Sequence, residues 1–295
     1  MPNTITINAP LNEYVNVHRD ELIVRASATF ATLPYIDKMY GVKYQDVVPM
    51  LESSVEFKDG SACGWDPAGS DTISPIIIKD FPVVIQKTFC GKDFRKSFAN
   101  YQLNWKAGGV EVPFEEAFIN SNLQAVSEEL EKLVWNGNVA LGIDGFLKQL
   151  DTTKKTLVGT TAVEKIDEVV KGLTDRMLKK GVNIFVSPAL FRQYVSEVNA
   201  ECCSNKSTID AAVATLGYIG DSRVTIVPVS GLAGEKVQIV AATKDALVYA
   251  TDLENSENEF RWFKDEKDGS ENLEILFLAG TAVRYADEAQ LYVTA

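Results

Sequence analysis

The chain has 295 residues, of which 46% are hydrophobic and 24% are charged, so it can bury a substantial core like an ordinary globular protein. Its formal net charge of −12, without a cluster of Lys and Arg, argues against high-affinity phosphate binding. Four cysteines are too few for a disulfide scaffold, and the amino terminus lacks the features of a signal peptide. The best apolar run, residues 273–282, is too short for a membrane span, so we expect no membrane association.

The first 110 residues are predicted to contain an arm, short helices and strands. Residues 1–20 are polar and indicate either an arm that adds a strand to a neighbour or a frayed terminus, and residues 21–50 indicate one or two short helices. Residues 55–110 combine Gly and Pro with the β-branched runs 76–78 and 83–85, which is typical of strands. A two-stranded excursion of this length cannot bury itself alone, so it must lie on its own core or on an adjacent subunit.

One long amphipathic helix is predicted over residues 113–135. Pro113 suits the first turn and Gly137 is the expected stop. About 22 residues span about 33 Å, a length that suits a structural beam. An apolar stripe recurs at helical spacing, and acidic residues are placed on the opposite face. The stripe contains Phe118, Ile119, Leu123, Val126, Leu130, Leu133 and Val134, and the acidic face contains Glu115, Glu116, Glu128, Glu129 and Glu131.

Residues 159–250 are predicted to form a compact α/β domain inserted between the long helix and a final hairpin. A helix is expected over residues 162–180, and a second one begins at Ser187-Pro188 after a buried strand. The final hairpin turns at Asp268-Gly269 and is followed by a short closing strand at residues 290–293. The domain that carries the long helix and the hairpin is therefore expected to be discontinuous.

The sequence contains no recognisable catalytic, cofactor-binding or metal-binding constellation. His18 is the only histidine, so a Ser/His/Asp or Cys/His mechanism would depend on it alone. The cysteines include no C-x-x-C pair, and the glycine-rich segments do not match a phosphate loop. Cys63 and Cys90 flank the two sides of the predicted loop, and we hypothesise that they form a disulfide or a contact pair at its base. Buried apolar cysteines are the default alternative.

Three phrases carry a resemblance to a known family: EELEKLVWNGN followed by IDGFLKQL, NIFVSPALFRQY, and AGTAVRYADEAQLYV. With the order arm, extended loop, long helix, inserted α/β domain and terminal hairpin, the chain resembles the major capsid proteins of tailed double-stranded DNA bacteriophages over nearly its whole length.

This resemblance implies an α+β chain with the HK97-like capsid fold. The N-terminal arm and short helices would occupy residues 1–50, and the extended loop (E-loop) residues 51–110. The peripheral domain, with its long spine helix and β-hairpin, would combine residues 111–158 and 251–295. The axial domain would be the inserted α/β part, residues 159–250.

The implied function is structural and not enzymatic, without a cofactor. Copies of the chain would assemble into pentamers and hexamers that form an icosahedral head around phage double-stranded DNA, without sequence-specific DNA binding. The implied partners are scaffolding, portal and auxiliary head proteins. Because the family-like elements start almost at Met1, a separate scaffolding protein is expected. The protein would be made and assembled in the bacterial host cytoplasm and reside in the virion.

Contacts between subunits should depend on aromatic and arginine anchors in the loop. We predict Trp65, Phe89, Phe94, Arg95 and Trp105 for this role. Crosslinking between subunits is not predicted, because nothing selects Lys79 or Lys87 as the lysine for it.

Two alternatives remain open at this point. An encapsulin-type bacterial nanocompartment shell shares the fold and would enclose protein instead of DNA. A soluble α/β enzyme built on residues 159–250 is the second alternative, and its weakness is the missing catalytic constellation.

Overall fold

The computed structural model describes residues 15, 17–18, 21–22, 25–26, 30–42, 45–57, 69–90, 114–201, 216–218, 221–234, 236–252, 259–265 and 270–294. Within these residues the chain forms two six-stranded sheets and one long helix, together with shorter helices. The predicted α+β fold class is therefore confirmed.

The first sheet has the strand order β1-β9-β11-β3-β2, and β10 pairs with the part of β11 that β9 does not reach. β1 is parallel to β9, and the other pairs are antiparallel. The strands are β1 (Asp37–Tyr40), β2 (Gln45–Ser54), β3 (Ser70–Phe89), β9 (Leu247–Thr251), β10 (Glu259–Lys264) and β11 (Glu271–Val283).

Strand β3 buries opposite faces at different points along its length. Val83, Ile85 and Phe89 are odd-numbered and pack toward the large core beneath the first sheet. Ile76 and Ile78 are even-numbered and pack into a small cluster of apolar residues from β9 and β11 on the opposite face. The inward face of β3 therefore changes near Asp80.

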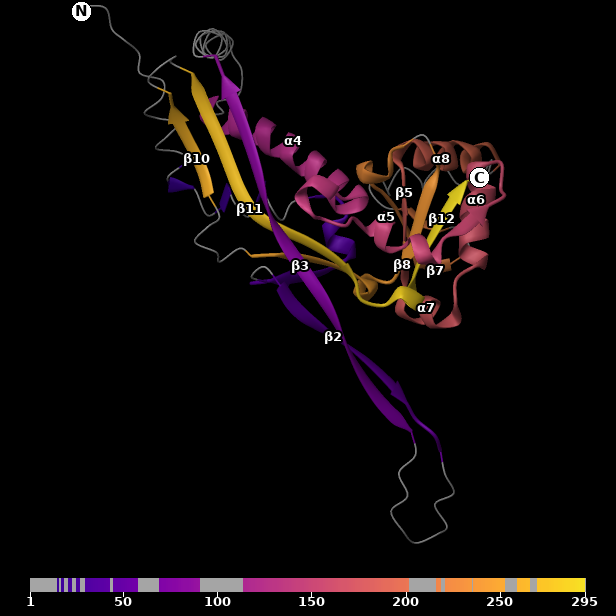
Figure 1. Ribbon diagram of the computed structural model, residues 1–295. Helices are drawn as coiled ribbons and strands as arrows, with labels where there is room; N and C mark the ends of the chain where they lie inside the picture. The colour runs from indigo at the N-terminus through magenta and orange to yellow at the C-terminus, as the bar shows by residue number, and fades with distance from the viewer. Residues whose placement is uncertain are drawn as a thin grey trace, which may run out of the picture.

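Helix α4 (Phe114–Asn136) confirms the predicted long helix and covers one face of the first sheet (Figure 1). It ends at Gly137, as predicted, where φ is +72° and the amide N–H donates to the Leu133 carbonyl over 2.8 Å. The prediction was wrong for Glu131, which is only 4% exposed, because Thr32 and Ser230 provide buried hydrogen-bond donors. The buried apolar residues of α4 include Ile119, Leu123, Val126, Leu130 and Val134.

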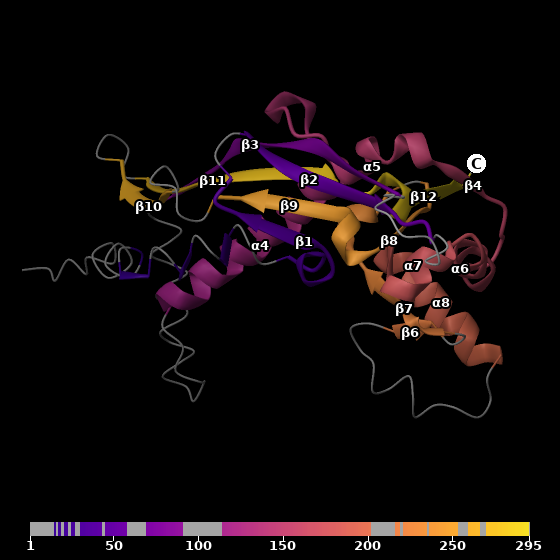
Figure 2. The same ribbon diagram turned by 90° about the horizontal axis from the view of Figure 1, so that it is seen from below.

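The second sheet has the order β4-β12-β8-β5-β7-β6 and lies at the end of α4, with helices around it (Figures 1 and 2). Its strands are β4 (Lys155–Leu157), β5 (Val182–Val186), β6 (Leu216–Tyr218), β7 (Asp221–Pro228), β8 (Gln238–Ala242) and β12 (Ala289–Thr294). The helices are α5 (Phe146–Gln149), α6 (Ala162–Lys171), α7 (Asp175–Lys180) and α8 (Pro188–Glu201). The 3-10 turns are η1 (Leu33–Tyr35), η2 (Val139–Leu141), η3 (Asp151–Thr153), η4 (Ser230–Leu232), η5 (Lys244–Ala246) and η6 (Ala286–Glu288).

Both faces of the second sheet are buried, and they face different cores. Ile184 and Ala241 point to the core that contains residues of α6, α7 and α8. Phe185 and Val240 alternate with them and point to the large core that also contains α4. The two sheets therefore share one hydrophobic core at the end of α4.

Some element predictions need correction. Residues 162–180 form two helices, because α6 ends at Gly172 and the Thr174 side chain accepts a hydrogen bond from Met177 N to start α7. Residues 21–50 contain helical residues, such as Leu22 and Ala26, but residues 37–40 and 45–50 are strands. The closing strand β12 exists as predicted and lies in the second sheet, beside β8 and β4.

Candidate functional site: the projecting hairpin

The most prominent surface feature is the hairpin of β2 and β3, which extends far beyond the rest of the molecule (Figure 1). The two strands pair without interruption from Gln45 opposite Lys79 to Ser54 opposite Ser70. β11 pairs with β3 only between Phe89 and Asp80. Among the described residues, the part of β3 beyond Asp80 therefore pairs only with β2.

The two long strands approach very closely where the hairpin leaves the sheet. Gly280 of β11 lies opposite Asp80, and a Cβ atom at Gly280 would lie 2.3 Å from the Lys79 carbonyl oxygen. Only glycine leaves room for this approach. Gly280 thus marks the point at which β3 passes from the sheet into the projection.

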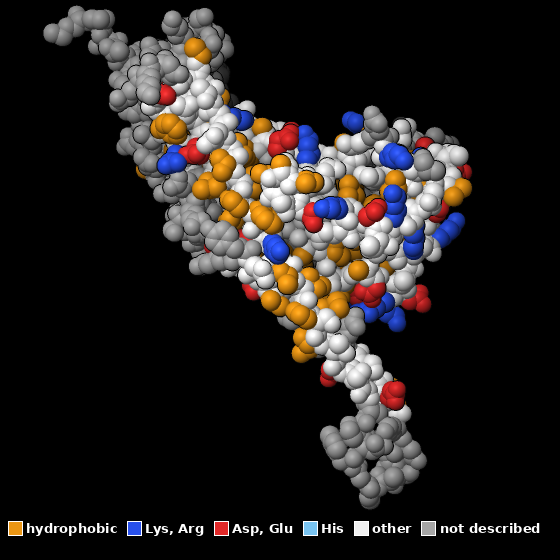
Figure 3. Space-filling model, in the orientation of Figure 1, with side chains coloured by type: hydrophobic (Ala, Val, Ile, Leu, Met, Phe, Trp, Pro, Cys, Tyr) orange, Lys and Arg blue, Asp and Glu red, His pale blue; other side chains and the backbone are white. Residues whose placement is uncertain are grey.

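One face of the projecting hairpin is apolar and exposed. Val47 pairs with Ile77, and Ile73 lies on the same face because it is four residues from Ile77 along the strand. Their exposed fractions are 50%, 54% and 69%, respectively. Val55 and Phe57, which follow β2, are also exposed. Orange side chains gather on the part of the hairpin next to the body in Figure 3, and such a patch is characteristic of an interaction surface.

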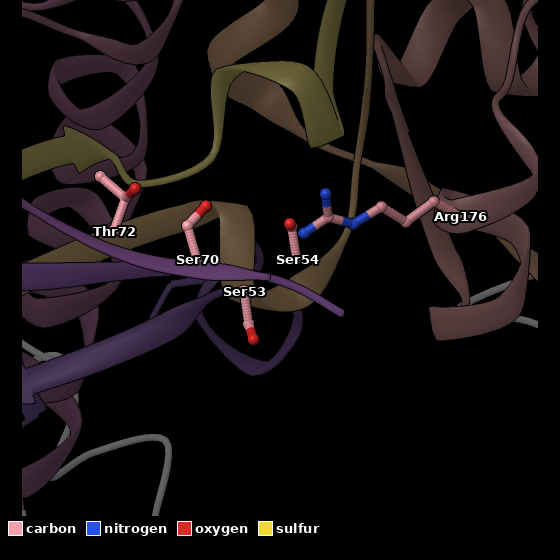
Figure 4. A pocket seen from close by; sticks show the side chains of 5 residues that line it. All are labelled: Ser53, Ser54, Ser70, Thr72 and Arg176. Atoms are coloured by element: carbon pink, nitrogen blue, oxygen red, sulfur yellow. The ribbon is translucent and has the colours of Figure 1, made fainter. Parts of the chain in front are cut away.

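The opposite face of the hairpin is polar at its outer part, around Ser70 and Thr72. Ser54 pairs with Ser70, and their hydroxyls point to the same side as that of Thr72 (Figure 4). These side chains, with Ser53, line a notch of about 380 Å3 that is completed by Arg176 from α7. The outer part of the hairpin is therefore an amphipathic two-stranded ribbon, with hydroxyl groups on the side that faces α7.

Arg176 already has acidic partners within the chain. Its Nε lies 2.8 Å from Glu288 Oε1, and its Nη1 lies 3.4 Å from Asp287 Oδ2. Lys180 Nζ also donates to both oxygens of Glu288, over 2.7 Å each. The positive charge beside the notch is thus balanced, so we do not assign an anion-binding role to it.

At the opposite end of β3, an aromatic cluster anchors the strand to its own chain. The Phe89 ring centroid lies 5.2 Å from that of Phe118 and 5.5 Å from that of Trp262. Trp262 Nε1 donates to the buried Glu271 carboxylate over 3.0 Å. Nearby, Lys87 Nζ donates to Asn122 Oδ1 over 3.0 Å. These contacts fix the Phe89 end of β3 to the rest of the chain, so the strand that continues into the projection is anchored at one end.

Solved structures with the same arrangement of elements are components of phage capsids and an encapsulin. A chain of the satellite phage P4 procapsid, in a structure that includes the size determination protein Sid, is 12% identical, with a TM-score of 0.63, covering 98% of this chain and 97% of that chain. A capsid chain of Myoviridae phage XM1 is 12% identical, with a TM-score of 0.57 and coverages of 90% and 92%. The chain has the HK97-like capsid fold.

The same fold occurs in the holo-SrpI encapsulin of Synechococcus elongatus, with a TM-score of 0.54, 12% identity and coverages of 88% and 85%. No protein-family model matches the sequence, and no curated protein matches it. The capsid fold is thus recognised through three-dimensional structure, at sequence identities that show the fold alone.

Within this capsid fold, the predicted contact residues fall in different places. Phe89 packs inside its own chain, as described above, and Cys90 is exposed. Whether Phe89 also contacts another subunit stays a prediction. The others lie outside the residues that the structure describes, so their roles and the Cys63–Cys90 pairing stay predictions as well: Trp65, Phe94, Arg95, Trp105 and Cys63.

Sequence reasoning missed the exposed apolar residues of the hairpin, Val47, Ile73 and Ile77. The signal was obscured by the run Ile76-Ile77-Ile78, which reads as a strand buried on both faces. In the capsid fold only the even-numbered face of this run is covered, by residues of β9 and β11.

The described ranges contain no group of three or more His, Cys, Asp or Glu side chains that could hold a metal ion. His18 lies 3.6 Å from Glu21 in the N-terminal segment. Across all residues that the structure describes, no helix has the length and apolar character needed to cross a membrane.

Proposed function

We propose that this chain is the major capsid protein of a tailed double-stranded DNA bacteriophage. Copies would assemble into pentamers and hexamers and then into an icosahedral head that encloses the DNA. The observation that carries this proposal is the apolar face of the hairpin, where Val47, Ile73 and Ile77 are exposed although they are strand-forming apolar residues. A second copy of the chain would supply the missing burial.

The likeness in fold to chains from phage capsids supports a structural, non-enzymatic role. The net charge of −12 suits a container wall that encloses a polyanion without binding it tightly. The protein would reside in the virion after assembly in the host cytoplasm, with scaffolding, portal and auxiliary head proteins as partners.

In this proposal the chain divides by function, and the parts do not coincide fully with the two sheets, because β4 and β12 lie in the second sheet and β9 lies in the first. Residues 51–110 act as the E-loop that reaches over a neighbour, and 159–250 form the axial domain. The peripheral domain combines 111–158 with 251–295. Trp65, Phe94, Arg95 and Trp105 are proposed as anchors of the loop, in line with the enrichment of aromatic and Arg residues at binding hot spots.

An encapsulin-type shell is the second candidate, favoured by the likeness to the Synechococcus elongatus encapsulin. The TM-score is higher for the P4 procapsid chain, 0.63 against 0.54, and we therefore rank the phage head first. The contents of particles isolated from the native source separate the two: double-stranded DNA for a phage head, and protein cargo for a nanocompartment.

The proposed assembly is tested by electron microscopy of the purified chain and of two lysine variants on opposite faces of the hairpin. Ile77→Lys places a charge on the apolar face, and we expect it to abolish rings or shells while the unassembled chain keeps its melting temperature. Ser70→Lys adds the same charge on the polar face and should assemble like the wild type.

A wild-type chain that stays monomeric at high concentration, even with its scaffolding protein, would contradict the proposed function. Normal assembly of Ile77→Lys would show that its face is not the contact surface. Unfolding of the unassembled Ile77→Lys chain would identify Ile77 as a core residue.

A further inference from the structure

A buried carboxylate at the end of α4 connects three distant parts of the chain. Glu131 is 4% exposed, and both of its oxygens are used. Oε1 accepts from Thr32 N over 3.1 Å and from Thr32 Oγ1 over 2.9 Å. Oε2 accepts from Ser230 N over 3.1 Å and also from the Ser230 hydroxyl. Four hydrogen bonds thus satisfy a side chain that would otherwise be costly to bury.

The connected parts belong to the two sheets of the fold, and we call each sheet with its attached segments one half of the fold. Thr32 immediately precedes η1 and then β1, an edge strand of the first sheet. Ser230 begins η4, which links β7 and β8 of the second sheet. Glu131 itself lies on the helix that covers the first sheet, so its two oxygens join the two halves.

Only an acidic side chain can make this particular connection. Each oxygen of the carboxylate faces an N–H group and a hydroxyl group, and a carboxylate has acceptors on both sides. In a glutamine of the same shape, one side would carry an NH2 group that faces a backbone N–H. Glutamine at residue 131 would therefore keep one half of the connection and break the other.

The surrounding contacts leave little room for the halves to move. Trp135 Nε1 donates to Thr32 Oγ1 over 2.9 Å, and Asn136 Nδ2 donates to the Gly231 carbonyl over 2.8 Å. A Cβ atom at Gly231 would lie 2.4 Å from Trp135 Cδ1. The Trp135 ring centroid is 5.0 Å from that of Phe185 in the second sheet. We call Glu131, Thr32, Ser230 and these neighbours the joint. The joint is closely packed, so its hydrogen bonds determine a single arrangement of the two halves.

We infer that Glu131 is a positioning residue that holds the second sheet at one angle to the first and thereby sets the curvature of the assembled shell. This inference rests on the proposed function. The first sheet carries the projecting hairpin, so a rotation between the halves changes the direction in which each copy meets the next. In a closed assembly that rotation is repeated at every copy, and it decides whether and at what size the shell closes.

The test compares Glu131→Gln with Glu288→Gln, a matched change of a second buried carboxylate. Glu288 bonds to Lys180 and Thr243, which differ from the Thr32 and Ser230 partners of Glu131, and it lies on η6, which connects β11 of the first sheet to β12 of the second. Shell diameters are measured by cryo-electron microscopy, and hydrogen exchange of the Thr32 and Ser230 amides is measured on the unassembled chains.

We expect the wild type and Glu288→Gln to form one diameter class. Glu131→Gln should form more than one class or open sheets, with at least about tenfold faster exchange at one of the two amides, as expected for a lost hydrogen bond. If Glu131→Gln does not fold, Ser230→Ala removes one of the four bonds and should still broaden the distribution of diameters.

Glu131→Gln shells with the wild-type diameter distribution would overturn the inference, even if the variant melts at a lower temperature. An equal change of diameter in Glu288→Gln would also overturn it, because the effect would then not be specific to the hydrogen bonds of Glu131. Failure of the wild type to assemble would instead contradict the proposed function. If the Thr32 and Ser230 amides of Glu131→Gln exchange hydrogen at the same rate as in the wild type, the joint does not depend on the carboxylate.

Discussion

Two buried glutamates, Glu131 and Glu288, are held by different chemistry. Glu131 accepts hydrogen bonds only from neutral donors among its described contacts. Glu288 is 1% exposed and lies against Lys180 and Arg176. A carboxylate with cationic partners gives folding a dependence on pH that can be predicted in sign.

Burial by itself raises the pKa of Glu288. Hydrogen bonds from Lys180 and Thr243, with the charges of Lys180 and Arg176, outweigh burial and leave the pKa below its ordinary value of 4.5. A group whose pKa is lowered in the folded state stabilises the fold above its unfolded pKa. That stabilisation is lost as the pH falls through the folded pKa.

Glu288→Gln is therefore expected to destabilise the unassembled chain at pH 7 by about 1–3 kcal/mol, because the cations lose their charged partner. The difference from the wild type should shrink as the pH falls below 4.5 and protonates the wild-type carboxylate. Thermal unfolding followed by circular dichroism at pH 7 and at lower pH values measures both effects.

The control is Glu129→Gln, which removes an exposed ion pair with Lys132 and should leave the melting temperature unchanged. If the loss of stability in Glu288→Gln stays constant over the whole pH range, the charge of Glu288 does not contribute to the stability of the fold.

Among the elements, the point at which β3 separates from β11 explains how a strand can leave a sheet and continue as a projection. β3 has 20 residues, about 66 Å at about 3.3 Å per residue, and β11 supports only the half that ends at Asp80. The change of the buried face near this point places Ile78 inward and Ile77 outward. Gly280 permits the close approach of the two backbones.

Gly280→Ala is expected to destabilise the chain by about 1–3 kcal/mol, because the new methyl group would overlap the Lys79 carbonyl oxygen. Gly234→Ala is the matched control, since a Cβ atom there would meet no atom within 4 Å. Urea unfolding of both variants measures the difference, and equal stability would show that the strands can separate at low cost.

At the scale of the whole molecule, the large core lies beneath the first sheet and at the end of α4, and no described residue of the outer hairpin belongs to it. Asp46 pairs with Ile78, so a two-residue Asn-Gly turn can replace residues 47–77 and close a short hairpin.

The shortened chain is expected to fold with a melting temperature near that of the wild type and to remain unassembled, because it keeps its core and lacks the exposed apolar face. Calorimetry and size-exclusion chromatography test these two outcomes. Loss of folding would place the hairpin in the chain's own core, and assembly into shells would show that the hairpin is dispensable for it.

Local patterns were sufficient to predict several of the regular elements, although not β1 and β2. The apolar stripe of α4 and its stop at Gly137 are helical signals that depend on neighbouring residues alone. Ser187 is also a local signal, because its side chain accepts from Leu190 N at the start of α8. The antiparallel pairing of β10 with β11 likewise joins neighbouring segments of the chain. Gly172 was the local exception, because the need for glycine there comes from the distant Tyr292, whose hydroxyl would lie 2.3 Å from a Cβ atom.

The sequence by itself determined the periodic elements, their order along the chain and, through the order and phrases that resemble a known family, the capsid fold. The tertiary structure alone decided that Glu131 is buried, that Ile77 is exposed and that β12 lies in the second sheet. The physical reason is that periodicity shows which residues share a face of an element, whereas contacts between distant segments decide which face is covered. Thr32 and Ser230 are 99 residues from Glu131 in opposite directions, and no local pattern brings them together.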